Sequence, residues 1–156
     1  MHFPLIKFEK IDTPIEDWDI DVDPESVSIQ ANTDYYGELY NAEERRSIIE
    51  SKWLKNFFDG IAIIDTEKET ITFLNPDVID TTLKNYLIHV TSDLYVEAQK
   101  KKLRGYSLRS AGKYYKDCIS MFNIDDYWQD SFDFIDDAHF HAGETWMIGN
   151  IFDAHI

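Results

Sequence analysis

Two histidines near the C-terminus have the spacing that most resembles a metal site. His139 and His141 are separated by one residue, so in an extended segment both imidazoles would point to the same side. Two imidazoles and a carboxylate can hold zinc or iron. The third ligand is unspecified, although acids and another histidine are near in the sequence: Asp136, Asp137, Glu144 and His155. We therefore predict that His139 and His141 are surface histidines among acids and do not form a tight transition-metal site.

The sequence holds no other strong catalytic pattern. It has no nucleophile elbow, Walker loop, dinucleotide fingerprint or Cys-x-x-Cys pair. The stretch Ala111-Gly112-Lys113 lacks the upstream glycine of a phosphate-binding loop. Cys118 has no activating motif around it, which favours a small core residue over a nucleophile. We expect neither an enzyme nor a bound cofactor.

An alternation of acidic and apolar residues occupies positions 17–23. Four aspartates, at 17, 19, 21 and 23, alternate with Trp18, Ile20 and Val22. On an extended backbone these carboxylates would lie about 6.6 Å apart on one face, a row of charge that broadly resembles a phosphate backbone. The alternative is an amphipathic edge strand whose charges prevent aggregation. An EF-hand loop is excluded because Val22 and Ser28 stand where glycine and glutamate are required.

A second acidic segment, residues 123–137, combines aspartates with aromatic residues. We predict a short helix here that buries Ile124, Trp128 and Ile135 and displays its acids. Both acidic segments would then present carboxylates beside a large aromatic side chain. The candidate partner-binding residues are Asp17, Trp18, Asp19, Asp21, Asp23, Glu25, Asp125, Asp126, Trp128, Asp130, Asp133, Asp136 and Asp137.

The net charge of the 156-residue chain is −15, and it is unevenly distributed. Residues 1–44 carry twelve acids and two bases, residues 45–116 carry nine acids and thirteen bases, and residues 117–156 carry nine acids and no base. Basic residues from Lys100 to Lys116 alternate with tyrosines, a pattern that can bind nucleic acid. The overall negative charge would repel a polyanion, so we expect a basic protein as partner and no direct contact with nucleic acid.

The remaining patterns predict the elements that position these residues. Residues 61–74 read as a β-hairpin that ends at a helix start, Asn75-Pro76-Asp77. An apolar stripe from Ile79 to Ala98 predicts a helix over 76–102, and residues 42–58 predict another that ends at Gly60. Strands are expected at 3–8, 26–31 and 145–152, the last with a bulge at Gly149, and a further helix from Leu108. Together they predict one α+β domain over 1–156, with a mostly antiparallel sheet of four or five strands covered by three or four helices.

The amino-acid composition also indicates the cellular compartment of the protein. One cysteine excludes an intrachain disulfide and fits a reducing environment. The N-terminus does not resemble a secretory leader, and no run of apolar residues is long enough to span a bilayer. We therefore expect a cytoplasmic protein with no membrane partner.

Charge and surface chemistry favour a binding protein that inhibits a partner by occupying a basic site. Immunity proteins, antitoxins and phage counter-defence inhibitors that mimic nucleic acid work in this way as a class. Two other interpretations stay open. One is a small metal-dependent enzyme centred on His139 and His141, and the other is a structural or oligomeric domain whose charge maintains solubility.

Overall fold

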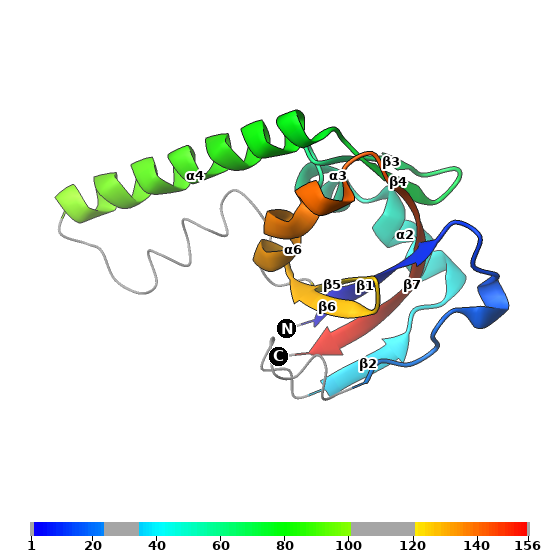
Figure 1. Ribbon diagram of the computed structural model, residues 1–156. Helices are drawn as coiled ribbons and strands as arrows, with labels where there is room; N and C mark the ends of the chain where they lie inside the picture. Colours follow the sequence, from blue (N-terminus) through cyan, green and yellow to red (C-terminus); the bar gives the residue numbers. More distant parts are fainter. Residues whose placement is uncertain (1, 24–34, 101–120, 156) are drawn as a thin grey trace.

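The computed structural model describes residues 2–23, 35–100 and 121–155, and it belongs to the α+β class (Figure 1). The strands are β1 (His2–Lys10), β2 (Tyr35–Leu39), β3 (Ala62–Asp65), β4 (Thr70–Phe73), β5 (Met121–Ile124), β6 (Tyr127–Asp130) and β7 (Thr145–His155). The α-helices are α2 (Ala42–Glu50), α3 (Lys52–Phe57), α4 (Pro76–Gln99) and α6 (Ser131–Asp137), and two 3₁₀ helices are η1 (Ile15–Asp17) and η2 (Ala138–His141).

Three predicted features lie outside the described residues. They are the strand over 26–31, most of the helix expected from Leu108 onward, which includes Cys118, and the basic stretch beyond Lys100. The last residue assigned to that predicted helix, Phe122, is a strand residue in β5.

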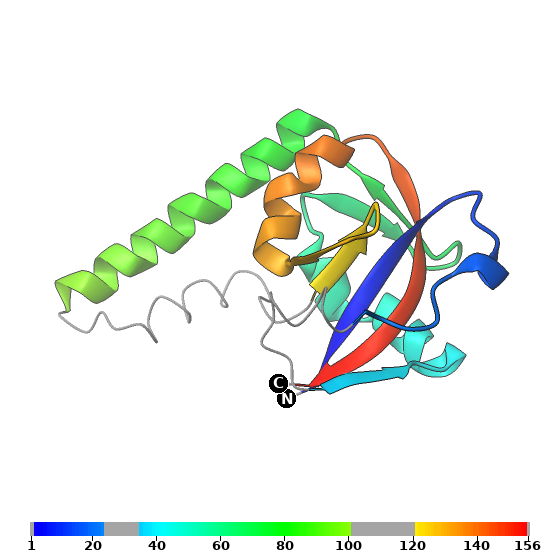
Figure 2. The same cartoon turned by 60° about the horizontal axis from the view of Figure 1, so that its bottom comes forward.

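Within the described residues, one sheet of seven strands has the order β3-β4-β7-β1-β5-β6, and β2 also pairs with β7. The long strand β7 pairs with β1 along one side, while β4 and β2 pair with opposite ends of its other side. Figure 2 shows β1 and β7 side by side through the middle of the molecule. Among the described pairings, β1 with β5 is the parallel one. The prediction of four or five strands was therefore too low, and the 61–74 hairpin lies at an edge of the sheet.

Local signals for that hairpin and its flanking helices are confirmed. β3 and β4 pair antiparallel with Ala62 opposite Phe73, and Gly60 has the left-handed φ of 75° expected after a helix. The predicted 42–58 helix is divided at Ser51, whose extended backbone ends α2 and whose hydroxyl accepts a hydrogen bond from the Leu54 amide. A serine that caps the next helix so well favours a break over a continuous helix.

Apolar side chains pack on both faces of the sheet. The main cluster includes Phe8 and Phe122 of the sheet. The helices pack against them through residues such as Phe57 and Phe134. A second cluster on the other face includes Leu5 and the β5 and β6 side chains Met121 and Trp128. Because side chains alternate along a strand, Lys7 and Glu9 continue the row of Leu5 on the second face. The second apolar face is therefore bordered by a buried charged pair.

The predicted bulge at Gly149 is present. Ile6 pairs with Ile151 but Phe8 pairs with Ile148, so β7 has one more residue than β1 between these pairs. A Cβ atom on Gly149 would lie 2.9 Å from the Lys7 carbonyl oxygen and 2.7 Å from the Glu9 side chain. Only glycine permits this close approach without a shift of the neighbouring strand.

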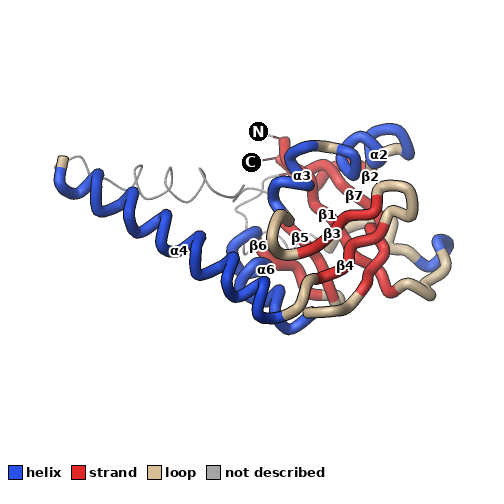
Figure 3. Tube along the Cα trace, turned by 90° about the horizontal axis from the view of Figure 1, so that it is seen from above, coloured by secondary structure: helices blue, strands red, loops and turns tan. Residues whose placement is uncertain are grey.

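The long helix α4 begins where expected, since the Asn75 side chain accepts a hydrogen bond from the Val78 amide. Its packing differs from the prediction. Ile79 is fully buried and Leu83 packs against the main cluster, but Leu87, which belongs to the predicted stripe, is exposed. Figures 1 and 3 show α4 extending away from the sheet, with its first turns beside α6 and η2. None of the described helices, α4 included, combines the length and apolar character needed to cross a bilayer.

The first turn and the middle of α4 are expected to respond differently to the same substitution. Ile79→Val should lower the free energy of unfolding by about 1 kcal/mol, because it removes a methylene from the packed core. Ile88→Val on the same helix should change it very little, because that side chain is 52% exposed. Urea unfolding of both variants tests this difference. Equal losses would show that the middle of α4 is packed in solution.

Candidate functional site

Lys7 brings the two acidic segments together. Its side chain is 8% exposed, and its ammonium group donates hydrogen bonds to the carboxylates of Asp19 and Asp126, the latter at 3.1 Å. The Glu9 carboxylate lies 3.8 Å from the same nitrogen. Asp19 belongs to the loop of residues 11–23, and Asp126 belongs to the turn between β5 and β6. This loop and this turn are therefore adjacent, and we refer to their exposed carboxylates as the acidic face.

The turn of the acidic face is a two-residue hairpin. Ile124 pairs with Tyr127, which leaves Asp125 and Asp126 between the strands, and both have positive φ angles of 53° and 60°. Positive φ at both central residues defines the type I′ turn, which matches the twist of a hairpin and which aspartate tolerates better than most residues. Since Lys7 pairs in register with Asn123 in the neighbouring strand, the turn begins close to the lysine.

The loop of the acidic face is held down by Trp18. The indole is buried, and its Nε1 donates a hydrogen bond to the Thr13 carbonyl oxygen at 3.4 Å. The guanidinium of Arg45 lies 5.5 Å from the centre of the Trp18 ring, a cation–π arrangement. The Asn150 side chain donates a hydrogen bond at 2.8 Å to the Asp19 carbonyl oxygen. Both the backbone and a side chain of the loop are thus attached to the sheet.

Arg45 joins four parts of the structure. From α2 it donates hydrogen bonds to the carbonyl oxygens of Ile148 and Gly149 at the β7 bulge, the latter at 2.8 Å. It also donates to Glu69, the residue before β4, at 2.5 Å. Its side chain is mostly buried, so these bonds are protected from water. The bulge, the β3–β4 turn, α2 and the Trp18 loop are all positioned by this one guanidinium.

The electrostatics of the Lys7 cluster keep the lysine charged. Burial by itself would lower the pKa of Lys7, but the hydrogen bonds to Asp19 and Asp126 raise it above its usual value. Burial raises the pKa of Glu9, and the charges of Asp19 and Asp126 act in the same direction against the lowering effect of Lys7. The Oε1 atom of Glu9 is buried without a hydrogen-bond partner. Glu9 therefore depends on the ammonium group of Lys7 for compensation.

The structure divides the predicted partner-binding residues that it describes into three groups, and one further residue is not described. Those of the acidic face are exposed: Asp17, Asp19, Asp21, Asp23, Asp125 and Asp126. Both tryptophans of the set, Trp18 and Trp128, are buried and therefore present no aromatic surface to a partner. Glu25 lies outside the described residues. The remaining acids, Asp130, Asp133, Asp136 and Asp137, lie at the end of β6 and on α6.

Two predictions about backbone conformation are wrong. Residues 17–23 do not form an extended strand, because Asp17 ends η1 and the rest is loop. Residues 123–137 do not form one helix but the β5–β6 hairpin followed by α6. Burial of Ile124, Trp128 and Ile135 was nevertheless predicted correctly. In both segments the residues that do reach the interior, such as Trp18 and Trp128, are buried by long-range packing that overrides local periodicity.

The acids of α6 belong to a different surface from the acidic face. α6 packs on the main cluster through Phe134 and Ile135, on the face of the sheet opposite to Lys7. Asp130 caps the helix by accepting a hydrogen bond from the Asp133 amide at 2.9 Å, and Asp137 accepts one from the Gln129 side chain at 2.5 Å. Burial and the neighbouring acids raise the pKa of Asp133. Capping and hydrogen bonding account for part of this acidic cluster.

His139 and His141 lie on η2 and not in an extended segment, and their Nδ1 atoms have different partners. The Nδ1 of His139 lies 3.0 Å from the Asp136 carbonyl oxygen, and that of His141 lies 2.9 Å from the Glu144 carboxylate. Across the ranges 2–23, 35–100 and 121–155, no three residues among His, Cys, Asp and Glu are grouped so as to hold a metal ion. The arrangement instead attaches η2 to the start of β7.

Glu144 should make the stability depend on pH in the acid range. Burial opposes its ionisation, but hydrogen bonds from His141 and Trp146 lower its pKa below the ordinary value of 4.5. Its contribution is thus complete above that value and is lost as the pH falls through the lower pKa of the folded state. We expect Glu144→Gln to cost about 0.5 kcal/mol near neutral pH and less in acid. Urea unfolding at both pH values measures this, and a difference independent of pH would contradict it.

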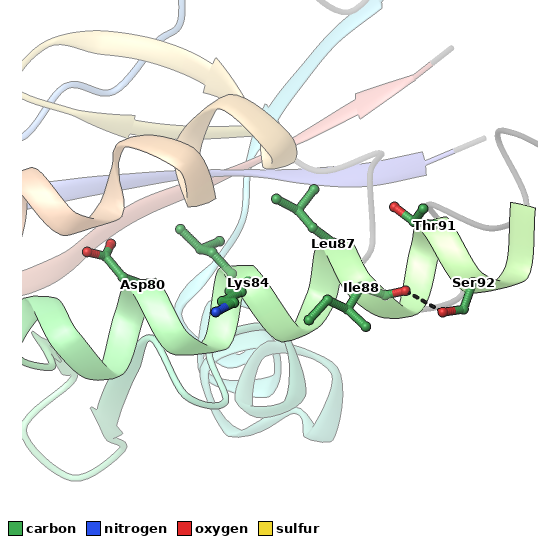
Figure 4. Close-up of a pocket in the computed structure, with 7 residues that line it drawn as sticks. Asp80, Lys84, Leu87, Ile88, Thr91 and Ser92 are labelled. Atoms are coloured by element: carbon green, nitrogen blue, oxygen red, sulfur yellow. Dashed lines mark hydrogen bonds between the residues drawn. The ribbon is translucent and has the colours of Figure 1, made fainter.

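Two hollows are informative about ligands. The larger, about 520 Å³, runs along the exposed side of α4 and is lined by Asp80, Leu83, Lys84, Leu87, Ile88, Thr91 and Ser92 (Figure 4). Among the residues that the structure describes, its lining comes from the single helix α4. The smaller, about 220 Å³, adjoins the acidic face and is lined by Phe8, Glu9, Lys10, Thr13, Asp125, Asp126 and Trp146.

Comparison with known proteins gives no relative: no family model, curated protein or solved structure matches this chain. Lys7, Glu9 and Arg45 are the central residues that the sequence patterns did not indicate. A signal for Lys7 exists, because it is one of only two bases among the first 44 residues and it interrupts the apolar alternation of a strand.

Proposed function

We propose that this protein is a small acidic binding protein that inhibits a partner by occupying a basic, nucleic-acid-binding site on it. The observation that carries the proposal is the shared contact of Asp19 and Asp126 with Lys7. Two acidic segments more than 100 residues apart in the sequence are joined there into one face. Such a face belongs to the type found in immunity proteins, antitoxins and counter-defence inhibitors that mimic nucleic acid.

The charge of the acidic face supports this role. The loop and the turn carry eight exposed carboxylates, and those of Asp19 and Asp126 bind one buried ammonium group, which leaves the face strongly negative. Negative charge concentrated on one face accelerates association with a positive site and disfavours other negatively charged molecules. The effect is screened over about 8 Å at physiological ionic strength, so it is strongest when a partner is close.

The proposal predicts that charge at the acidic face controls association. A triple variant, Asp17→Asn, Asp21→Asn and Asp125→Asn, removes three charges but leaves both hydrogen-bonding partners of Lys7 in place. A matched control, Asp59→Asn, Glu67→Gln and Asp80→Asn, removes three exposed charges elsewhere. Affinity capture from extract of the cells that make the protein would identify the partner, and association rates would then be measured with each variant.

We expect wild type and control to capture a basic protein and to block its binding to nucleic acid. The acidic-face variant should associate about tenfold more slowly, and the difference should decrease as salt is added. Equal association rates for the two triple variants would contradict the proposal. So would a captured protein that lacks a basic site.

A further inference from the structure

Three isoleucines of the loop at 11–23 are exposed. Ile11, Ile15 and Ile20 have 50%, 72% and 74% of their surface accessible. One exposed isoleucine is ordinary in a folded protein. Three of them within ten residues are different, particularly in a segment that carries six acids and no base. Solubility alone explains the acids but not the isoleucines among them.

The same loop has an ordered backbone that keeps these side chains outside. The Thr13 amide donates to the Lys10 carbonyl oxygen at 2.9 Å, and the Asp17 amide donates to the Pro14 carbonyl oxygen at 3.0 Å. The loop also buries Trp18 and packs Val22 against the second apolar cluster. Apolar residues that face inward are thus separated from those that face water. Figure 1 shows η1, at the centre of this loop, on the outer edge of the molecule.

We infer that the exposed isoleucines are the apolar anchors of the acidic face, so that its partner is a protein surface on which apolar side chains lie between arginines or lysines. This inference rests on the proposed function and specifies the partner's chemistry. A preordered loop loses little conformational freedom on binding, which makes exposed apolar side chains effective anchors. With both tryptophans buried, these isoleucines take the role that aromatic side chains have at many interfaces.

The negative charge of the loop favours a basic protein over the other partners that an exposed apolar surface could bind. Six acids around the isoleucines would repel a second copy bound through the same face, an anionic lipid surface and a nucleic acid. The hollow of about 220 Å³ continues the surface, because Thr13 of the loop and Asp125 and Asp126 of the turn all line it. The loop that carries the isoleucines and the turn that carries Asp125 and Asp126 therefore border the same hollow.

Two synthetic peptides test the inference with the whole protein. One alternates arginine with serine and the other alternates arginine with leucine, with the same number of arginines in each. Binding is measured by fluorescence anisotropy at about 0.05 M and about 0.5 M NaCl, since the higher salt screens the ionic part. The variant Ile15→Ser with Ile20→Ser is compared with a control, Ile63→Ser with Ile88→Ser, whose isoleucines are exposed on β3 and α4.

We expect wild type and control to bind the leucine peptide about tenfold more tightly than the serine peptide, and to keep that preference at high salt. The loop variant should lose the preference but still bind both peptides at low salt. Equal binding of both peptides by wild type would overturn the inference and leave the proposed function standing. A preference retained by the loop variant, or lost equally by the control, would also overturn it. No binding of either peptide at low salt would overturn the inference and the proposed function together.

Discussion

Replacing Arg45 with alanine is expected to lower the free energy of unfolding by about 3 kcal/mol, the largest effect of any single substitution considered. The guanidinium donates to the Ile148 and Gly149 carbonyl oxygens and to the Glu69 carboxylate in a mostly buried position. Alanine would remove this donor from both carbonyl oxygens and from Glu69, which would keep only the more distant Arg46 at 3.5 Å among its described cations, and it would remove the cation from the Trp18 ring. Unfolding in urea, followed by tryptophan fluorescence, measures the loss.

The neighbouring arginine is the matched control for this substitution. Arg46 forms an exposed ion pair with Glu50 one turn along α2 and a longer one, 3.5 Å, with Glu69. Its removal should change stability little because pairs of an exposed guanidinium are screened by water. Arg45→Lys should behave more like Arg45→Ala than like wild type, since an ammonium group cannot reproduce three directed bonds. If Arg45→Ala and Arg46→Ala were equally stable, Arg45 would not be the joint between α2, the bulge and the loop.

Replacing Lys7 with methionine is expected to cost about 2 kcal/mol. Methionine has a similar length and suits a buried position, so the loss reports the charge and not a cavity. Asp19 and Asp126 are exposed and can turn toward water, which limits the cost. The Glu9 side chain is mostly buried and cannot turn toward water in this way. Its carboxylate would therefore remain as a buried charge without a nearby cation.

A second substitution separates the contribution of Glu9. In the Lys7→Met background, Glu9→Gln should recover about half of the lost stability, because it removes the charge that the lysine had compensated. Lys10→Met, at an exposed position on the same strand, is the control and should be near wild type. If the double variant were no more stable than Lys7→Met, the loss of stability would come instead from the hydrogen bonds of Lys7 to the two aspartates.

Loss of either basic residue should also affect the acidic face. Lys7 connects the loop to the turn, and Arg45 supports the loop through Trp18. Both variants would allow the carboxylates and the exposed isoleucines to move relative to one another. A partner that uses the whole face would then meet a less ordered surface and bind it more weakly.

Much of the local structure could be predicted because its signals lie in adjacent residues. The 61–74 hairpin, the left-handed Gly60 and the helix start at Asn75 are examples. In each case a few neighbouring side chains and one backbone conformation are sufficient. The bulge at Gly149 was also predicted, although its reason, the close approach of the Lys7 carbonyl oxygen, lies on another strand.

Periodicity was less informative where the interior is supplied by distant residues. The stripe of α4 predicts a buried face along the whole helix, yet Ile79 is buried and Leu87 is exposed. The alternation at 17–23 predicts a strand, yet Trp18 is buried by a loop that is anchored to Arg45. A sequence pattern states which residues prefer to avoid water, but it does not state whether other elements are available to cover them.

The sequence by itself determined the α+β class, the main caps and turns, and the concentration of acids near both ends of the chain. Only the tertiary structure decided that β1 and β7 form the centre of the sheet and that the acids divide between the acidic face and α6. The physical reason is that these features depend on contacts between residues far apart in the sequence. The Lys7–Asp126 contact joins residues 119 positions apart, and it exists because parallel pairing of β1 with β5 brings a two-residue turn to a lysine on the neighbouring strand.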